Sequence, residues 1–192
     1  MTRDARSPSP SHVPRLPDSV RVAVVVSQYH QELCEAMAYS AWKTLAAAGL
    51  GEDAEEDEPA FVAVPAPGAF ELPLLAERLL DEDDFDAVLC FGVLLKGETT
   101  HDFHIASAVS HALQRIAQEH GRPVLFGLLT CETLEQARAR ALPGGREGGH
   151  DKGREVALAA IETLRAIAQI SDQEYGDYWS AAQQREELRR RA

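Results

Sequence analysis

Four short apolar segments, each followed by a segment of helical periodicity, constrain the fold of this chain more than any other feature. The first, RVAVVVS at 21–27, is β-branched and almost uninterrupted, which is typical of a strand covered on both faces. Similar segments occupy 61–64, 86–95 and 123–130. Strands that alternate with helices imply right-handed crossovers and a parallel sheet between two helical layers. We therefore expect an α/β fold, a three-layer αβα sandwich around a four-stranded parallel sheet.

Helical periodicity predicts helices over residues 31–50, 70–81, 102–121, 133–141 and 152–169. This order of elements indicates a flavodoxin-like domain, which we expect to span residues 21–170. Prolines interrupt residues 1–20 repeatedly, so this part is predicted to be a flexible N-terminal arm. Residues 171–192 form a C-terminal tail that is either a docking helix or a frayed extension.

Composition excludes several classes of protein. The formal net charge of −12 argues against nucleic-acid binding, which needs a basic surface. No segment approaches the roughly 20 consecutive apolar residues of a membrane span, and the N-terminus lacks the apolar core of a secretory signal. Three widely spaced cysteines fit neither a disulfide framework nor a metal site. We expect a cytoplasmic protein with no membrane or nucleic-acid partner, whose cysteines act as small apolar residues.

The segment GETTHD at 97–102 follows the third strand and opens a helix. In sheets of this kind, ligands bind beyond the carboxyl ends of the strands. Thr99 or Thr100 can cap the helix, and the free amide groups at its start form a small site for an anion such as phosphate. His101 lies next to that site, and imidazole groups carry protons in either direction near neutral pH. The alternative is a capped helix start with an incidental surface histidine.

Two other strand ends carry aromatic and acidic residues. In PGAFELP at 67–73, Phe70 offers an aromatic face and Glu71 can accept a hydrogen bond from a ring N–H. Tyr29 follows the first strand and could stack on a planar ligand. Arg140 could fold back onto the anion site as a phosphate clamp. Each has a plain alternative, namely a turn with a helix-capping acid, a packing tyrosine and a solvated arginine.

Together these segments resemble a known family. PGAFELP, GVLLKGETTH, PVLFGLLT, EQARARA and DKGREVALAAIE occur in the order and near the spacings of 6,7-dimethyl-8-ribityllumazine synthase, over about residues 21–168. The resemblance implies the penultimate step of riboflavin biosynthesis. In it, 5-amino-6-(D-ribitylamino)uracil condenses with 3,4-dihydroxy-2-butanone 4-phosphate, and neither a metal nor an organic cofactor takes part.

The resemblance also assigns roles to residues of this chain. Tyr29 stands at the position of the stacking aromatic, and Phe126 at that of an aromatic that closes the pyrimidine site from the neighbouring subunit. The other positions that match the pyrimidine and ribityl site are Ala69, Phe70, Glu71, Val93, Leu94 and Leu95.

The remaining matches concern phosphate and proton transfer. His101 matches the proton-transfer histidine, and the phosphate-binding positions are Glu98, Thr99 and Arg140. Lys152 and Glu155 match a charged pair near the site, although a surface ion pair of small energetic value is the simpler interpretation.

The resemblance implies self-association, with active sites formed between the subunits of a pentamer. The spacer between Arg140 and Lys152 is longer than in compact members of the family, which favours free or paired pentamers over a 60-subunit shell. Riboflavin synthase is a further candidate partner. The alternatives are a catalytically weak flavin- or lumazine-binding assembly protein and, more remotely, a generic flavodoxin-like binding module.

Overall fold

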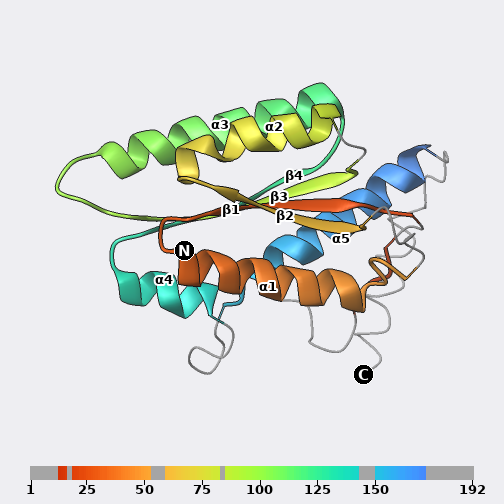
Figure 1. Ribbon diagram of the computed structural model, residues 1–192, viewed down its shortest axis with the longest axis horizontal. Coiled ribbons are helices and arrows are strands. Elements are labelled where there is room, and N and C mark those ends of the chain that lie inside the picture. The colour runs from red at the N-terminus through yellow and green to blue at the C-terminus, as the bar shows by residue number, and fades with distance from the viewer. Residues whose placement is uncertain (1–12, 17–18, 53–58, 83–84, 143–149, 172–192) are drawn as a thin grey trace, which may run out of the picture.

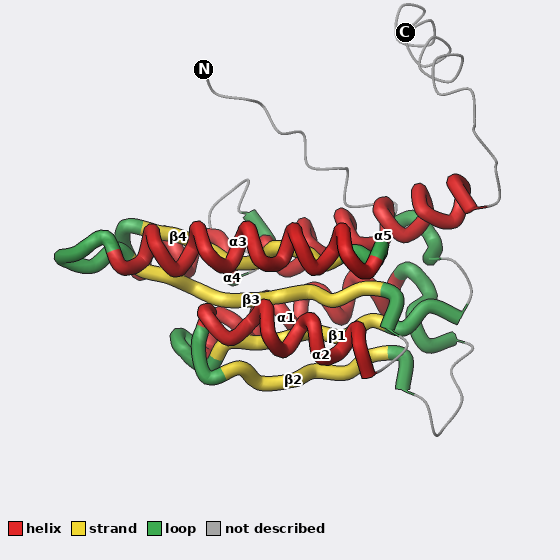
Figure 2. Tube along the Cα trace, turned by 90° about the horizontal axis from the view of Figure 1, so that it is seen from above, coloured by secondary structure: helices red, strands yellow, loops and turns green. Residues whose placement is uncertain are grey.

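The computed structural model describes residues 13–16, 19–52, 59–82, 85–142 and 150–171. Its strands form one parallel sheet in the order β2-β1-β3-β4, as Figure 2 shows from above. They are β1 (Val22–Ser27), β2 (Phe61–Ala66), β3 (Ala87–Leu95) and β4 (Val124–Cys131). The sheet lies between two helical layers, with α2 and α3 on one face and α1, α4 and α5 on the other (Figure 1). The predicted three-layer α/β fold is confirmed.

The helices begin and end close to where the sequence predicts them. They are α1 (Gln31–Ala47), α2 (Leu72–Glu82), α3 (His101–His120), α4 (Leu134–Ala141) and α5 (Lys152–Ser171). Two differences are local. The expected helix 31–50 ends earlier because Gly49 has a φ of 99°, which a right-handed helix cannot accommodate. The expected helix 70–81 is preceded by a 3₁₀ turn, η1 (Ala69–Glu71), before α2 begins.

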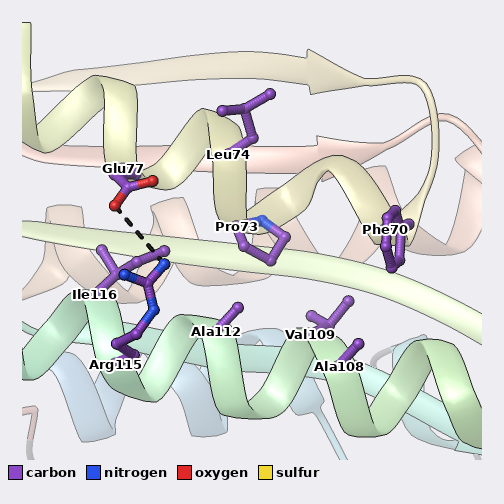
Figure 3. A pocket seen from close by; sticks show the side chains of 9 residues that line it. All are labelled: Phe70, Pro73, Leu74, Glu77, Ala108, Val109, Ala112, Arg115 and Ile116. Carbon is purple, nitrogen blue, oxygen red and sulfur yellow. Dashed lines mark ion pairs between the residues drawn. The ribbon is translucent and has the colours of Figure 1, made fainter.

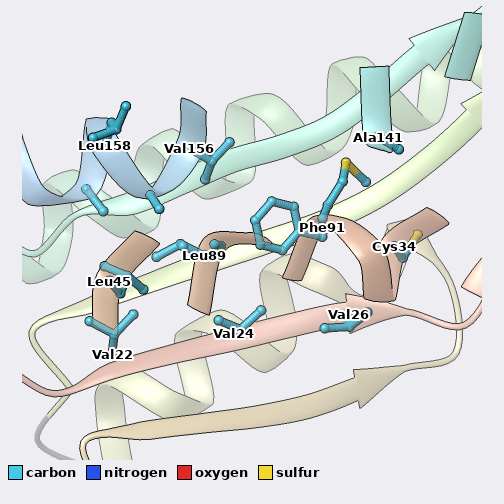
Figure 4. Packing of buried hydrophobic residues seen from close by; sticks show 14 of the residues in the cluster. Val22, Val24, Val26, Cys34, Leu45, Leu89, Phe91, Ala141, Val156 and Leu158 are labelled. Atoms are coloured by element: carbon cyan, nitrogen blue, oxygen red, sulfur yellow. The ribbon is translucent and has the colours of Figure 1, made fainter. Parts of the chain in front are cut away.

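The strand side chains alternate between two cores. On β1, Val22, Val24 and Val26 pack with α1, α4 and α5, and Figure 4 shows them beneath Leu45 and Phe91. Ala23 and Val25 belong to the opposite core, beneath α2 and α3. All six β1 residues are buried, which explains why this strand has no polar face. Burial on both sides fixes the register of the sheet, because a slip by one residue would exchange the two faces.

The close crossing of α1 and α5 positions the start of α5. A Cβ atom added at Gly153 would lie 2.0 Å from the Met37 carbonyl oxygen, so only glycine fits. Next to this contact, the Ser40 hydroxyl donates a 2.6 Å hydrogen bond to the Asp151 carboxylate. Lys152 and Glu155 therefore lie beside the middle of α1.

Part of the expected N-terminal arm is described. Leu16 is buried, and its N–H donates to the Ala48 carbonyl at 2.8 Å. The predicted tail beyond Ser171 and most of the spacer before Lys152 lie outside the described residues. None of the described helices has the length and apolar character needed to cross a bilayer.

Candidate active site

The strand order places a topological switch point between β1 and β3. The chain leaves β1 for β2 on one side and returns to β3 on the other. Ligands of doubly wound sheets bind beyond the carboxyl ends of the strands at such a point. Pairing of β1 with β3 ends at Val26 and Phe91, whereas pairing of β3 with β4 continues to Leu95 and Cys131. The edge is therefore stepped, and the loop after β3 projects furthest, at the left of Figure 1.

Gly68 brings two predicted site residues together. A Cβ atom at this position would lie 3.0 Å from Glu71 Oε2 and 3.7 Å from Cδ2 of the Tyr29 ring. The Tyr29 ring and the Glu71 carboxylate thus flank one glycine, although they come from different loops. Tyr29 is 72% exposed and Phe70 is 61% exposed, so both aromatic faces are open to a ligand. This corner, formed by Tyr29, Gly68, Phe70 and Glu71 and called the ring corner below, combines aromatic surface with a half-buried carboxylate. Such a surface suits a planar ring that carries N–H groups.

The strand-end residues divide into packing and lining positions. Ala69 is buried, and a Cβ atom at Gly92 would lie 3.5 Å from its Cβ. The Ala69 side chain therefore holds the 3₁₀ turn against β3. Val93 is also buried, while Leu94 and Leu95 are half-buried on the part of β3 that extends beyond β1. These residues form a hydrophobic surface at the edge of the sheet, where the backbone groups of β3 are not paired with β1.

The loop from Lys96 to Thr100, called the anion loop below, leads directly into α3. Every residue in it is exposed, as is His101, the first residue of the helix. Thr100 occupies the N-cap position, but its side chain makes no capping hydrogen bond. Glu98, Thr99 and His101 make no side-chain hydrogen bond or ion pair to any other described residue. Because the first amide groups of a helix have no intrahelical acceptor, this helix start offers N–H and O–H donors to an anion.

Arg140 lies near the same edge. It is exposed, and its Nη1 donates to the Gln136 carbonyl at 3.0 Å within α4. Burial raises the pKa of the Cys131 thiol and the positive charge of Arg140 lowers it, so the guanidinium lies near the end of β4. Cys131 pairs with Leu95, which immediately precedes the anion loop. A second cation, Lys96, forms a 3.6 Å ion pair with Glu132.

Phe126 is the predicted site residue that its own chain does not bring to this corner. It lies on the edge strand β4 in register with Cys90, five residues before the end of the strand, and is 39% exposed. Through Cys90 it is level with Val25 of β1, but it lies two strands away from β1, about 10 Å across the sheet. Lys152 Nζ and Glu155 Oε1 form a 3.0 Å ion pair at the start of α5.

An apolar groove runs between α2 and α3, away from the strand ends (Figure 3). Leu74 and Phe70 are exposed along it, and an ion pair of 3.9 Å joins Arg115 to Glu77. Phe70 also belongs to the 3₁₀ turn, so the groove begins where the ring corner ends.

Among the described residues, no group of three or more His, Cys, Asp or Glu side chains is arranged to hold a metal ion.

Sequence reasoning missed two buried side chains behind Tyr29. Ser27 Oγ accepts a hydrogen bond from the Tyr29 N–H at 3.3 Å, and Cys34 Sγ donates to the Tyr29 carbonyl at 3.3 Å. A serine that ends an otherwise apolar strand was an available signal, because short hydroxyl side chains often bond the backbone two residues on. For the cysteine, no local pattern predicted the contact.

Known proteins resemble this chain over most of its length. Residues 19–168 match the family model of 6,7-dimethyl-8-ribityllumazine synthase. The chain belongs to this family. A synthase of this name from Rhodopirellula baltica is 42% identical over 147 residues, which cover 77% of this chain and 88% of the relative. One from Stenotrophomonas maltophilia K279a is 37% identical, over 81% of this chain and 94% of the relative. One from Streptomyces coelicolor is also 37% identical, over 80% and 88%.

Membership of the lumazine synthase family confirms the resemblance carried by the GAFE and GETTH segments. The chain is an enzyme of the transferase class that belongs to riboflavin biosynthesis.

Proposed function

We propose that this chain condenses 5-amino-6-(D-ribitylamino)uracil with 3,4-dihydroxy-2-butanone 4-phosphate to give 6,7-dimethyl-8-ribityllumazine. The observation that carries the proposal is the corner at Gly68, where an exposed tyrosine ring and a carboxylate from separate loops meet. A flat substrate with ring N–H groups and a ribityl chain needs such a surface. The open helix start at Thr100 suits the second substrate, which is a phosphate ester.

The ring corner would orient the aminouracil. Tyr29 stacks on the pyrimidine, Glu71 accepts hydrogen bonds, and the backbone near Val93 and Leu94 reads the ring edge. Holding two reactants in a productive geometry can lower a barrier by several kcal/mol, on the order of 7–11 in favourable cases. The condensation therefore depends mainly on alignment of the ring amine with the ketone carbonyl.

The helix start would hold the phosphate and move protons. Glu98, Thr99 and Arg140 bind the phosphorylated substrate, and His101 transfers protons beside it. The ring amine adds to the ketone and water leaves, which gives an imine. Loss of a proton from carbon then expels inorganic phosphate, and attack of the ribitylamino nitrogen on the new carbonyl closes the second ring with loss of another water. A general acid–base group contributes about 10²–10⁴-fold to such proton transfers.

Self-association completes the proposal. Phe126 lies on the edge strand β4, separated from the ring corner by β3, and its exposure there suits contact with a neighbouring subunit. The apolar groove between α2 and α3 is a suitable contact surface for a pentamer. Lys152 and Glu155 are accessory at most. Riboflavin synthase, which uses the product, is proposed as a partner in the cytoplasm.

Stoichiometry tests the proposed reaction. With purified protein and both substrates, we expect one inorganic phosphate released for each lumazine formed, and neither product above background when either substrate is omitted. Phosphate release without the aminouracil would indicate a phosphatase. Tight binding of the lumazine without any turnover would instead support the binding-protein alternative.

A further inference from the structure

We infer that Cys34 is a positioning residue that fixes the Tyr29 stacking face against the pyrimidine-binding edge of β3, an inference that rests on the proposed function. Its side chain is buried at the start of α1, behind the ring corner. Figure 4 shows Cys34 at the end of its core, past Val26 and Phe91.

The thiol connects the two sides of the proposed ring site. Sγ donates to the Tyr29 carbonyl at 3.3 Å. The backbone of Val93 lies close enough to the same sulfur to lower the pKa of the thiol, and Cys34 and Val93 belong to the same buried core. Pairing of β1 with β3 ends at Phe91, so no strand bonds join β1 to this part of β3. One side chain therefore spans the gap between the β1–α1 loop and the end of β3.

The Tyr29 backbone is held on both sides by buried side chains. Its N–H is bonded to Ser27 Oγ and its carbonyl to Cys34, while the ring itself is 72% exposed. The next residue, His30, has φ 52° and ψ 44°, a left-handed conformation that is unfavourable for a residue other than glycine. A strained turn persists only where its surroundings determine it. Here the Leu33 and Cys34 amides donate to the His30 carbonyl and hold the turn at the helix start. The side chains of Ser27 and Cys34 in addition hold the Tyr29 backbone that carries the ring.

The Cys34 thiol keeps its proton near neutral pH. Burial raises the pKa of Cys34 to about 12, and the nearby backbone of Val93 only partly opposes this shift. The sulfur is therefore a neutral donor to the Tyr29 carbonyl and not a nucleophile. This separates a positioning role from a covalent one.

Substitution of Cys34 tests the inference through the two Michaelis constants. Cys34→Val removes the donor at similar size, and we expect the KM for the aminouracil to rise about threefold to tenfold, the value of one modest hydrogen bond. The KM for the butanone phosphate should stay within about twofold. Cys34→Ser, which keeps a donor, should restore the aminouracil KM. Cys90→Val is the matched control, because Cys90 is equally buried but lies in the opposite core.

An unchanged aminouracil KM in folded Cys34→Val, or an equal rise of both constants, would overturn the inference. If Cys34→Val does not fold, Cys34→Ala against Cys90→Ala answers the same question. A second readout does not depend on turnover. Amide hydrogen exchange over residues 27–33 should be faster in Cys34→Val and unchanged in Cys90→Val. If the wild-type protein has no synthase activity but exchange is still faster in Cys34→Val, the proposed function is refuted and the positioning role remains. Unchanged exchange in Cys34→Val would overturn the positioning role.

Discussion

Replacement of Gly68 by alanine should separate substrate binding from stability. The backbone at Gly68 is extended, with φ −153° and ψ −178°, so alanine introduces no conformational strain. The new methyl group would lie 3.0 Å from Glu71 Oε2, whereas ordinary contacts begin at 3.4 Å, so the carboxylate must move by about 0.4 Å. It would also lie 3.7 Å from the Tyr29 ring, an ordinary contact that leaves the ring in place.

The expected cost falls on the hydrogen bonds that Glu71 makes to the ring. A hydrogen bond to a charged group is worth roughly 1.5–3 kcal/mol, and a partial loss of about 1.4 kcal/mol corresponds to a tenfold change in affinity. We therefore expect Gly68→Ala to raise the KM for the aminouracil about tenfold. The free energy of unfolding should change by less than about 0.5 kcal/mol, because the lower entropy of the unfolded chain offsets the crowding.

Initial rates of lumazine formation at saturating butanone phosphate would give the aminouracil KM, and urea titration would give the stability. A double-mutant cycle with Glu71→Ala tests whether the effect of Gly68→Ala passes through Glu71, since this effect should largely disappear once the displaced side chain is gone. An unchanged aminouracil KM in Gly68→Ala, or full additivity with Glu71→Ala, would refute the assignment of Glu71 to the ring.

Other predictions concern separate parts of the molecule. His101→Ala should lower kcat about 10²-fold or more without abolishing turnover, because alignment of the substrates remains; a folded variant with no detectable activity would contradict this. Arg140→Ala should raise the KM for the butanone phosphate at least about tenfold and leave the aminouracil KM unchanged. A KM for the butanone phosphate equal to that of the wild type would exclude Arg140 from phosphate binding. Gly153→Ala should lower the free energy of unfolding by about 2 kcal/mol or more in urea titration, since its Cβ would meet the Met37 carbonyl. Burial raises the pKa of the Cys34 thiol from 9.0 to about 12, so the unfolded chain loses this proton first. Stability should then fall as the pH rises from about 9 towards 12, and less steeply in Cys34→Val; equal slopes would contradict the shift.

The fold was predictable because each strand and helix carries a strong local pattern. The uninterrupted apolar run of β1 reflects burial on both faces, and its side chains alternate between the two cores. The loops of the candidate site followed from the rule for parallel sheets, which needs only the order of the elements. Tyr29, Glu71 and His101 follow from this rule without any distance.

What could not be predicted depends on register and on contacts between distant segments. The extension of β3 and β4 beyond β1 is a property of the sheet as a whole, and it decides how far the anion loop stands from the ring corner. Cys34 is buried, as expected of a small apolar residue, but its bond to Tyr29 depends on the left-handed turn at His30. Histidine is less common in that conformation than glycine or asparagine, so no local pattern predicts this turn.

The central claim is that the ring corner and the helix start form one active site for two substrates. The most direct test is the rate of lumazine formation, followed by absorbance with both substrate concentrations varied and the uncatalysed rate subtracted. We predict a rate above background that saturates in each substrate independently. A folded protein that gives no rate above background at any concentration of either substrate would contradict the account.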